Sequence, residues 1–316
     1  MIKNVVFMGT PDFAVGTLQA LLDCDRYQVQ AVFTQPDKPK GRGKAMQMTP
    51  VKEVAVAAGI PVYQPVKIRE PEYVEILKEL KPDAIVVVAF GQLIPKVILE
   101  LPEHGCINVH ASLLPMYRGA APIQWAVING DKESGVTTMR MDEGLDTGDM
   151  ILKETVTLAE DETGGSLFDK LSATGAELLI KTLDAINDGT AVYEKQPQES
   201  TTAYAAMLTK KDGLVDWNRS AAELECLIRG LNPWPSAYTR YRGKTLKLWA
   251  AKVEAQGQTE KVQPGMAAEV TKTTLKIQTG DGLLSITELQ PEGKKRMAVD
   301  AFLRGYPVEV GEKLGE

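Results

Sequence analysis

The first half of the chain alternates short apolar runs with stretches of helical periodicity. The runs at residues 5–8, 29–33 and 84–89 are rich in valine and isoleucine and have the length of strands. The unbroken apolarity of residues 84–89 fits a strand buried on both faces, as in a parallel sheet. Thr49 and Pro50 are typical of a helix cap followed by a first-turn proline, and Pro71 opens another helical segment. The pattern predicts an α/β class with a Rossmann-like, mostly parallel sheet.

The periodicity fades towards the end of this half, where the run QPQESTT at residues 196–202 is typical of a linker. Beyond it, one helix is followed by short alternating runs separated by glycines, which predicts a small β-barrel of the OB type. We therefore expect a first domain at residues 1–189, a linker at 190–208 and a smaller C-terminal β-barrel domain at 209–316.

Charge is distributed unevenly between these parts. Residues 1–208 hold 19 Lys and Arg against 28 Asp and Glu, whereas residues 209–316 hold 17 against 14. A basic tail on an acidic body indicates a polyanionic partner, although a solvated surface explains the same charges. The three cysteines are far apart, which favours a reducing compartment. The apolar stretch near the N-terminus is too short for a signal or membrane-spanning segment, so we expect a cytoplasmic protein with no membrane partner.

Several common chemistries lack their motifs. The run GTPDFA at residues 9–14 does not have the GxGxxG spacing of dinucleotide sites, and no GxxxxGK[ST] phosphate loop occurs. HExxH and GxSxG are absent as well. With two histidines in the chain, a multi-histidine metal site cannot be built, so we expect no metal.

The run GCINVHASLLP at residues 105–115 carries the main chemical signal. An apolar strand ends there in polar groups, and Asn108 and His110 are two residues apart, so both side chains point to one face of a strand. Ligands bind beyond the carboxyl ends of parallel strands. An amide donor beside an imidazole suits a reaction that develops an oxyanion and moves a proton. The alternative is that Asn108 caps a turn and His110 satisfies a backbone carbonyl.

A second polar cluster, DEGLDTGD at residues 142–149, joins two expected strands. Acidic and glycine residues of this kind often form only a solvated turn. A carboxylate brought against His110 would stabilise positive charge on the ring and fix its orientation. We expect Asp146 to be that carboxylate.

These two segments together resemble the folate-dependent formyltransferases. The runs HASLLPMYRGAAP at residues 110–122 and GVTTMRMDEGLDTG at residues 135–148 carry the resemblance. It extends over essentially the whole chain to the members of that family that act on methionyl-tRNA, through MGTPDFA at 8–14, QPDKP at 35–39, GRGK at 41–44 and NPWP at 232–235. Residues 45–49 diverge from the family pattern.

The resemblance implies a reaction and its participants. The formyl donor would be 10-formyltetrahydrofolate, and the acceptor the free amino group of methionine on initiator methionyl-tRNA. Asn108, His110 and Asp146 would be catalytic, and the enzyme would be a monomer without a metal. The folate would be bound by Phe90, Gly91, Ser112, Leu113, Leu114, Pro115 and Asp142, although apolar packing of Phe90, Leu113 and Leu114 is equally what a core would show.

The basic segment with Lys38, Lys40, Arg42 and Lys44 follows a sheet strand. Alternating cations and glycines make a flexible element that could reach the phosphates or base edges of tRNA, and a solvated loop is the plainer explanation.

Three other functions stay open. A formyltransferase of a nucleotide-linked amino sugar should lack the GRGK segment, a hydrolase that releases formate from the same folate would not need it, and a non-catalytic RNA-binding protein would leave the catalytic residues unused.

Overall fold

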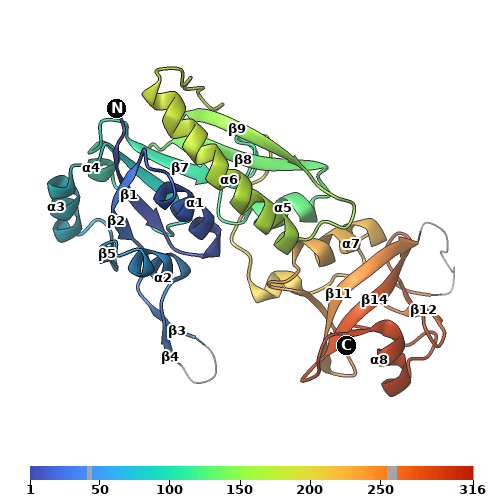
Figure 1. The fold of residues 1–316 in the computed structure, drawn as a ribbon. Coiled ribbons are helices and arrows are strands. Elements are labelled where there is room, and N and C mark those ends of the chain that lie inside the picture. Colours follow the sequence, from blue (N-terminus) through green and yellow to red (C-terminus); the bar gives the residue numbers. More distant parts are fainter. Residues whose placement is uncertain (41–44, 255–261, 316) are drawn as a thin grey trace. The chain divides into compact units, whose positions relative to one another are not determined.

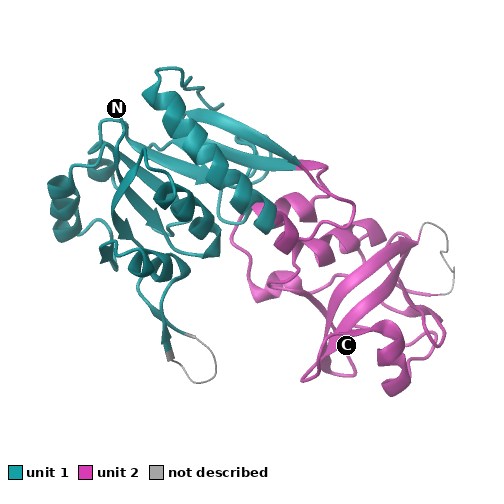
Figure 2. Ribbon diagram, in the orientation of Figure 1, with its two compact units in different colours: residues 1–122, 134–156, 168–205 teal, residues 123–133, 157–167, 206–316 magenta. Residues whose placement is uncertain are grey.

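The computed structural model describes residues 1–316 apart from 41–44, 255–261 and 316, and gives no side-chain surroundings for residues 40 and 45. The chain forms two compact units (Figure 2). Unit 1 comprises Met1–Pro122, Ser134–Val156 and Phe168–Ala205, and unit 2 comprises Ile123–Glu133, Thr157–Leu167 and Ala206–Glu316. Each unit is built around its own sheet.

Unit 1 is built on a seven-stranded sheet with the order β5-β2-β1-β6-β7-β8-β9 (Figure 1). The pairs from β5 to β7 are parallel, and β8 runs antiparallel to β7. Strands β1, β6 and β7 are buried almost throughout, because they lie inside the sheet. The strands are β1 Asn4–Gly9, β2 Gln28–Phe33, β5 Val62–Tyr63, β6 Ala84–Val88, β7 Cys106–His110, β8 Glu133–Arg140 and β9 Met150–Thr157.

Helices connect and cover these strands. At the start of α2 the Thr49 hydroxyl accepts a hydrogen bond from the Lys52 amide and Pro50 occupies the first turn, as the sequence predicts. Helix α6 packs on the sheet through Gly175, which lies against Val109 and Val136. The helices of unit 1 are α1 Asp12–Leu22, α2 Pro50–Ala57, α3 Pro71–Leu80, α4 Lys96–Leu99 and most of α6 Gly164–Asn187, whereas α5 Pro122–Ile128 lies almost wholly in unit 2.

Part of the segment expected to be a flexible basic element is instead paired. Strands β3 Lys38–Lys40 and β4 Ala45–Gln47 form an antiparallel ribbon. Asp37, just before β3, accepts a hydrogen bond from the Lys52 ammonium at 2.6 Å and another from Gln64 at 2.7 Å. The ribbon is therefore tied to α2 at its base.

Unit 2 contains a six-stranded antiparallel sheet with the order β10-β11-β14-β13-β12, and β15 pairs with β14. A capping box between Ser220 and Glu223 begins α7, and the helix presents Leu224, Leu227 and Ile228 as its buried face. The elements are η1 Lys210–Gly213, α7 Ala221–Gly230, β10 Ala237–Tyr241, β11 Lys244–Glu254, β12 Ala267–Val270, β13 Leu275–Gln278, β14 Leu283–Pro291, β15 Met297–Ala298 and α8 Val299–Gly305.

The predicted fold class is confirmed, with a mostly parallel sheet followed by a smaller antiparallel β domain. Across the described residues, no helix combines the length and apolarity needed to cross a membrane. Within the same residues, no group of three or more His, Cys, Asp and Glu side chains is placed to hold a metal ion.

Candidate active site

Strand β7 places Asn108 and His110 at the carboxyl end of the parallel part of the sheet. Both residues belong to the strand and are separated by one residue, so their side chains share a face. They are 8% and 6% exposed, which makes them buried polar groups in a strand whose other residues are buried and apolar. Buried polar groups are costly unless they find partners, so their contacts define what they can do.

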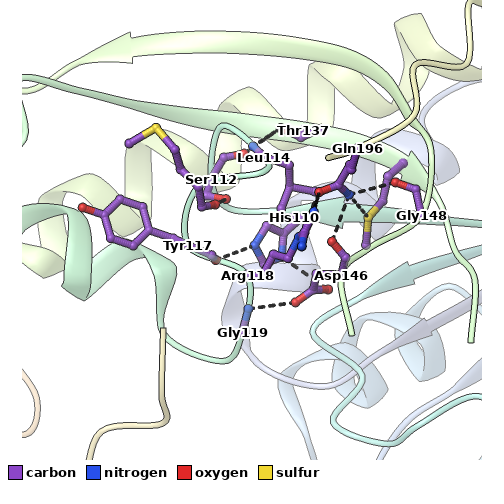
Figure 3. Close-up of polar contacts among 12 residues, drawn as sticks. His110, Ser112, Leu114, Tyr117, Arg118, Gly119, Thr137, Asp146, Gly148 and Gln196 are labelled. Carbon is purple, nitrogen blue, oxygen red and sulfur yellow. Dashed lines mark hydrogen bonds and ion pairs between the residues drawn. The ribbon is translucent and has the colours of Figure 1, made fainter. Parts of the chain in front are cut away.

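The ring of His110 has a partner at each nitrogen (Figure 3). Its Nε2 lies 3.0 Å from the carbonyl oxygen of Tyr117, and Nδ1 lies 3.8 Å from Asp146 Oδ1. A carbonyl oxygen can only accept, so Nε2 carries a proton and donates it. The 3.8 Å separation is longer than a hydrogen bond, and Nδ1 therefore keeps its hydrogen-bonding capacity for a bound molecule.

Asp146 reaches the histidine from the loop between β8 and β9. Its Oδ2 accepts a hydrogen bond from the Gly119 amide at 2.9 Å, and its φ of 55° lies in the left-handed region that non-glycine residues seldom adopt. Gly148 makes this loop possible, because an added Cβ would lie 1.9 Å from the carbonyl oxygen of Arg140. The structure thus brings His110 and Asp146 together, and Asn108 shares the face of β7 on which His110 lies.

Asp142 lies in the same loop, but its carboxylate serves the loop itself. Its Oδ1 accepts hydrogen bonds from the Gly144 amide at 3.0 Å and from the Thr147 hydroxyl at 2.7 Å.

The loop that follows β7 is fixed by Thr137, which donates to the carbonyl of Ser112 at 2.7 Å and accepts from the Leu114 amide at 3.0 Å. These bonds hold the backbone next to His110 in place.

The residues expected at the folate divide into two groups. Phe90 and Leu114 are 2% and 1% exposed and pack in hydrophobic clusters, so their side chains are core residues. Ser112 is buried and donates to the Met116 carbonyl, whereas Leu113 and Pro115 are half-buried. Gly91 is exposed and follows β6, which runs parallel to β7, so its backbone lies at the same edge of the sheet as His110.

The paired ribbon borders a separate hollow in unit 1. A cavity of about 340 Å³ lies where β1 and β2 end, and it is lined by Thr10, Gln35, Lys38 and Thr49 among others. Lys38 is thus the expected tRNA-contacting residue whose side chain can be placed. Arg42 and Lys44 lie outside the described residues, and the side-chain surroundings of Lys40 are not described either. The Lys52 ammonium, hydrogen-bonded to Asp37, holds the pKa of that carboxyl below its usual range.

Sequence reasoning missed a strap, residues 196–205, which lies along the loop at 115–121. Ser200 donates to the Pro115 carbonyl at 2.6 Å, the Tyr117 amide donates to Thr202 at 2.7 Å, and the amide of Ala205 donates to the carbonyl of Arg118 at 2.8 Å. The polar residues Ser200 and Thr202, which made this segment resemble a linker in the sequence, form two of these hydrogen bonds. No periodicity marks it, because its partners lie about 80 residues earlier in the chain.

Comparison with known proteins places this geometry in a family. The formyl transferase model matches residues 3–183, and the model for the formyl transferase C-terminal domain matches residues 207–307. A methionyl-tRNA formyltransferase of Agathobacter rectalis is 60% identical over 308 residues, covering 98% of each chain. One of Clostridioides difficile is 53% identical over 312 residues, covering 99% of this chain and all of the relative.

A solved structure shares the fold. The N-formyltransferase of Helicobacter canadensis, in complex with folinic acid and dTDP-3-aminofucose, has a TM-score of 0.65 at 20% identity, covering 94% of this chain and 100% of that one. The likeness to the methionyl-tRNA enzymes runs through the segments that hold Asn108, His110 and Asp146 and on through unit 2. The chain therefore belongs to the methionyl-tRNA formyltransferases, within the formyl transferase family.

Proposed function

We propose that the chain transfers the formyl group of 10-formyltetrahydrofolate to the free amino group of methionine on initiator methionyl-tRNA. The observation that supports this chemistry lies at the end of β7, where the imidazole of His110 faces the Asp146 carboxylate at 3.8 Å and Asn108 shares the strand face of His110. The full-length relatives support the acceptor, because each is a methionyl-tRNA formyltransferase. The product, N-formylmethionyl-tRNA, serves translation initiation.

The reaction begins with attack of the neutral amine on the formyl carbon. The nitrogen lone pair forms the new C–N bond, and the formyl oxygen becomes an oxyanion. In this mechanism the Asn108 amide donates to that oxygen, and His110, on the same face of β7, donates from Nδ1 in its doubly protonated form, since Nε2 already donates to the Tyr117 carbonyl. Fixed donors of this kind are worth roughly 3 to 4 kcal/mol each, since they need no reorganisation as charge develops.

Protons then move from the amine to the leaving nitrogen. The attacking amine loses a proton, the bond from the formyl carbon to N10 of the folate breaks, and N10 takes a proton. Asp146 faces His110 Nδ1 and holds the ring for this relay, while the Tyr117 carbonyl fixes Nε2. The bonds formed and broken balance without a covalent enzyme intermediate.

Backbone groups at the sheet edge form the proposed folate site. Gly91, Leu113 and Pro115 supply exposed or partly buried surface there, while the buried residues Phe90, Ser112 and Leu114 support it from below. Asp142 contributes by shaping the loop that carries Asp146. We assign catalysis to residues 1–189, the connection to 190–208 and tRNA binding to 209–316 together with Lys38, Lys40, Arg42 and Lys44.

A formyltransferase of nucleotide-linked amino sugars is not favoured, because those enzymes share only the fold with this chain. The test incubates the protein with 10-formyltetrahydrofolate and, in parallel, charged initiator tRNA, uncharged tRNA or a sugar nucleotide. We expect formyl transfer to the charged tRNA alone, measured as N-formylmethionine after ester hydrolysis. Release of formate without an acceptor would indicate the hydrolase instead, and binding of tRNA without turnover would indicate a non-catalytic protein.

A further inference from the structure

We infer that Gln196 is a positioning residue that holds Asp146 in its catalytic conformation. The inference rests on the proposed function, because it assigns Gln196 a role through Asp146 in formyl transfer. Gln196 is 50 residues away from Asp146 along the chain and belongs to the strap. Its side chain nevertheless lies between the Asp146 loop and a buried arginine (Figure 3).

The Asp146 loop needs an external support. Asp146 adopts the left-handed conformation with a φ of 55°, which is unfavourable for a non-glycine residue. A residue in such a conformation stays there only when its surroundings hold it. If the backbone relaxed, the carboxylate would leave both the Gly119 amide and the ring of His110.

Gln196 supplies that support through its amide nitrogen. Nε2 donates to the carbonyl oxygen of Asp146 at 2.9 Å and to that of Gly148 at 2.8 Å. A primary amide has two N–H groups, so one side chain can bridge both carbonyls and fix the backbone on either side of Thr147. Buried carbonyl oxygens that lose such partners are destabilised by their lost solvation.

Arg118 fixes the other end of the same amide. Its guanidinium donates to Gln196 Oε1 from Nε at 3.0 Å and from Nη2 at 2.8 Å. Arg118 is 7% exposed, and it also donates to the backbone carbonyls of Pro197 and Gln198. The Arg118 guanidinium needs an acceptor, and the carbonyls of Asp146 and Gly148 need a donor. Only the orientation of the Gln196 amide with Oε1 towards Arg118 and Nε2 towards the two carbonyls satisfies both. The catalytic loop is thereby linked to a buried cation through one side chain.

The sharpest test replaces one functional group without changing the shape of the side chain. Gln196→Glu keeps an acceptor for Arg118 and removes both N–H donors to the Asp146 loop. Gln198→Glu is the matched control, because Gln198 is exposed and only its backbone carbonyl takes part. We expect Gln196→Glu to lower kcat roughly tenfold to a hundredfold with KM for folate and for tRNA little changed, since misplaced catalytic groups slow the chemical step. Gln198→Glu should match the wild type.

A double-mutant cycle separates positioning from a merely structural role. In an Asp146→Asn background, Gln196→Glu should change kcat by less than about twofold, because the group through which it acts is already lost. Equal loss in both backgrounds, or a wild-type kcat for Gln196→Glu, would overturn the inference. If Gln196→Glu does not fold, Gln196→Leu against Gln198→Leu gives the same comparison. Absence of turnover in the wild type would overturn the proposed function itself.

Discussion

At His110, two interactions of different kinds act on one ring. The Tyr117 carbonyl accepts a hydrogen bond from Nε2, and Asp146 Oδ1 lies 3.8 Å from Nδ1. The sequence left open whether His110 serves a backbone carbonyl or chemistry, and the structure shows that one ring does the first while remaining available for the second. Its two nitrogens have different partners, which the two-residue spacing from Asn108 could not reveal.

We predict that His110→Ala and Asp146→Ala suppress formyl transfer about a hundredfold or more while tRNA still binds, because positioned acid–base groups contribute factors of this size. Single-turnover kinetics with charged tRNA, together with a binding titration, measure both quantities. Thermal unfolding checks that the fold survives. Turnover at the wild-type rate in either variant would remove that residue from the proposed mechanism.

Gly148 provides a second test at the residue scale. In Gly148→Ala the new Cβ would meet the Arg140 carbonyl at 1.9 Å, so the backbone has to move by more than a side-chain adjustment allows. We expect a loss of stability of about 1–3 kcal/mol, as for other overpacked sites, and a fall in kcat because Asp146 moves with the loop. Gly305→Ala is the control, since nothing lies within 4 Å of its added Cβ. Equal melting temperatures for the two variants would contradict the prediction.

At the scale of elements, periodic and capped segments are predictable from the sequence, and segments held by distant partners are not. Strand β6 and the cap of α2 follow from local residues, namely an unbroken apolar run and Thr49 before Pro50. The strap has no periodicity of its own, and its position depends on side-chain contacts with the loop at 115–121. Arg118 and Gln196 were missed for this reason, although Arg118 lies within the segment that carried the family resemblance.

A prediction on tRNA recognition concerns the basic segment at residues 38–44. We expect Arg42→Ala to weaken kcat/KM for charged tRNA far more than it changes the affinity for folate, because Arg42 belongs to the basic segment expected to contact tRNA and not to the residues expected at the folate. Arg69→Ala, at an exposed arginine between β5 and α3, is the matched control. Unchanged kinetics for tRNA in Arg42→Ala would mean that the segment is only a solvated loop.

At the scale of the whole molecule, the chain passes between its two units more than once. Residues 123–133 and 157–167 belong with the tail in unit 2, because α7 packs on α5 through Gly230 and Ile128 and Arg229 donates to the carbonyl of Glu162. A linear reading of composition could not assign these short segments, since their packing partners lie some 70 to 100 residues further along. The expected linker at residues 190–208 therefore remains a prediction. In the structure the last segment of unit 1 ends at Ala205, and the tail of unit 2 begins at the next residue.

The charge difference between the two parts of the chain leads to a prediction for binding of tRNA. If unit 2 neutralises phosphates, each contact releases counterions, so the logarithm of the binding constant falls with the logarithm of the salt concentration by about 0.7 to 0.9 per contact. Lys294 and Lys295 are exposed at the turn after β14 and are suited to such contacts. Because the chain crosses between units, point substitutions test this better than a truncation near residue 208, which would separate segments that pack together.

We expect the double variant Lys294→Gln and Lys295→Gln to show a salt slope lower by about 1.4 to 1.8 than the wild type, with affinity for formyl-folate unchanged. Lys272→Gln, at another exposed lysine of unit 2 in the turn between β12 and β13, should change the slope little if the contacts are local to the β14 turn. Titrations with tRNA across a salt series measure the slopes, and a separate folate titration tests the other site. Equal slopes for the double variant and the wild type would show that these two lysines do not contact phosphate.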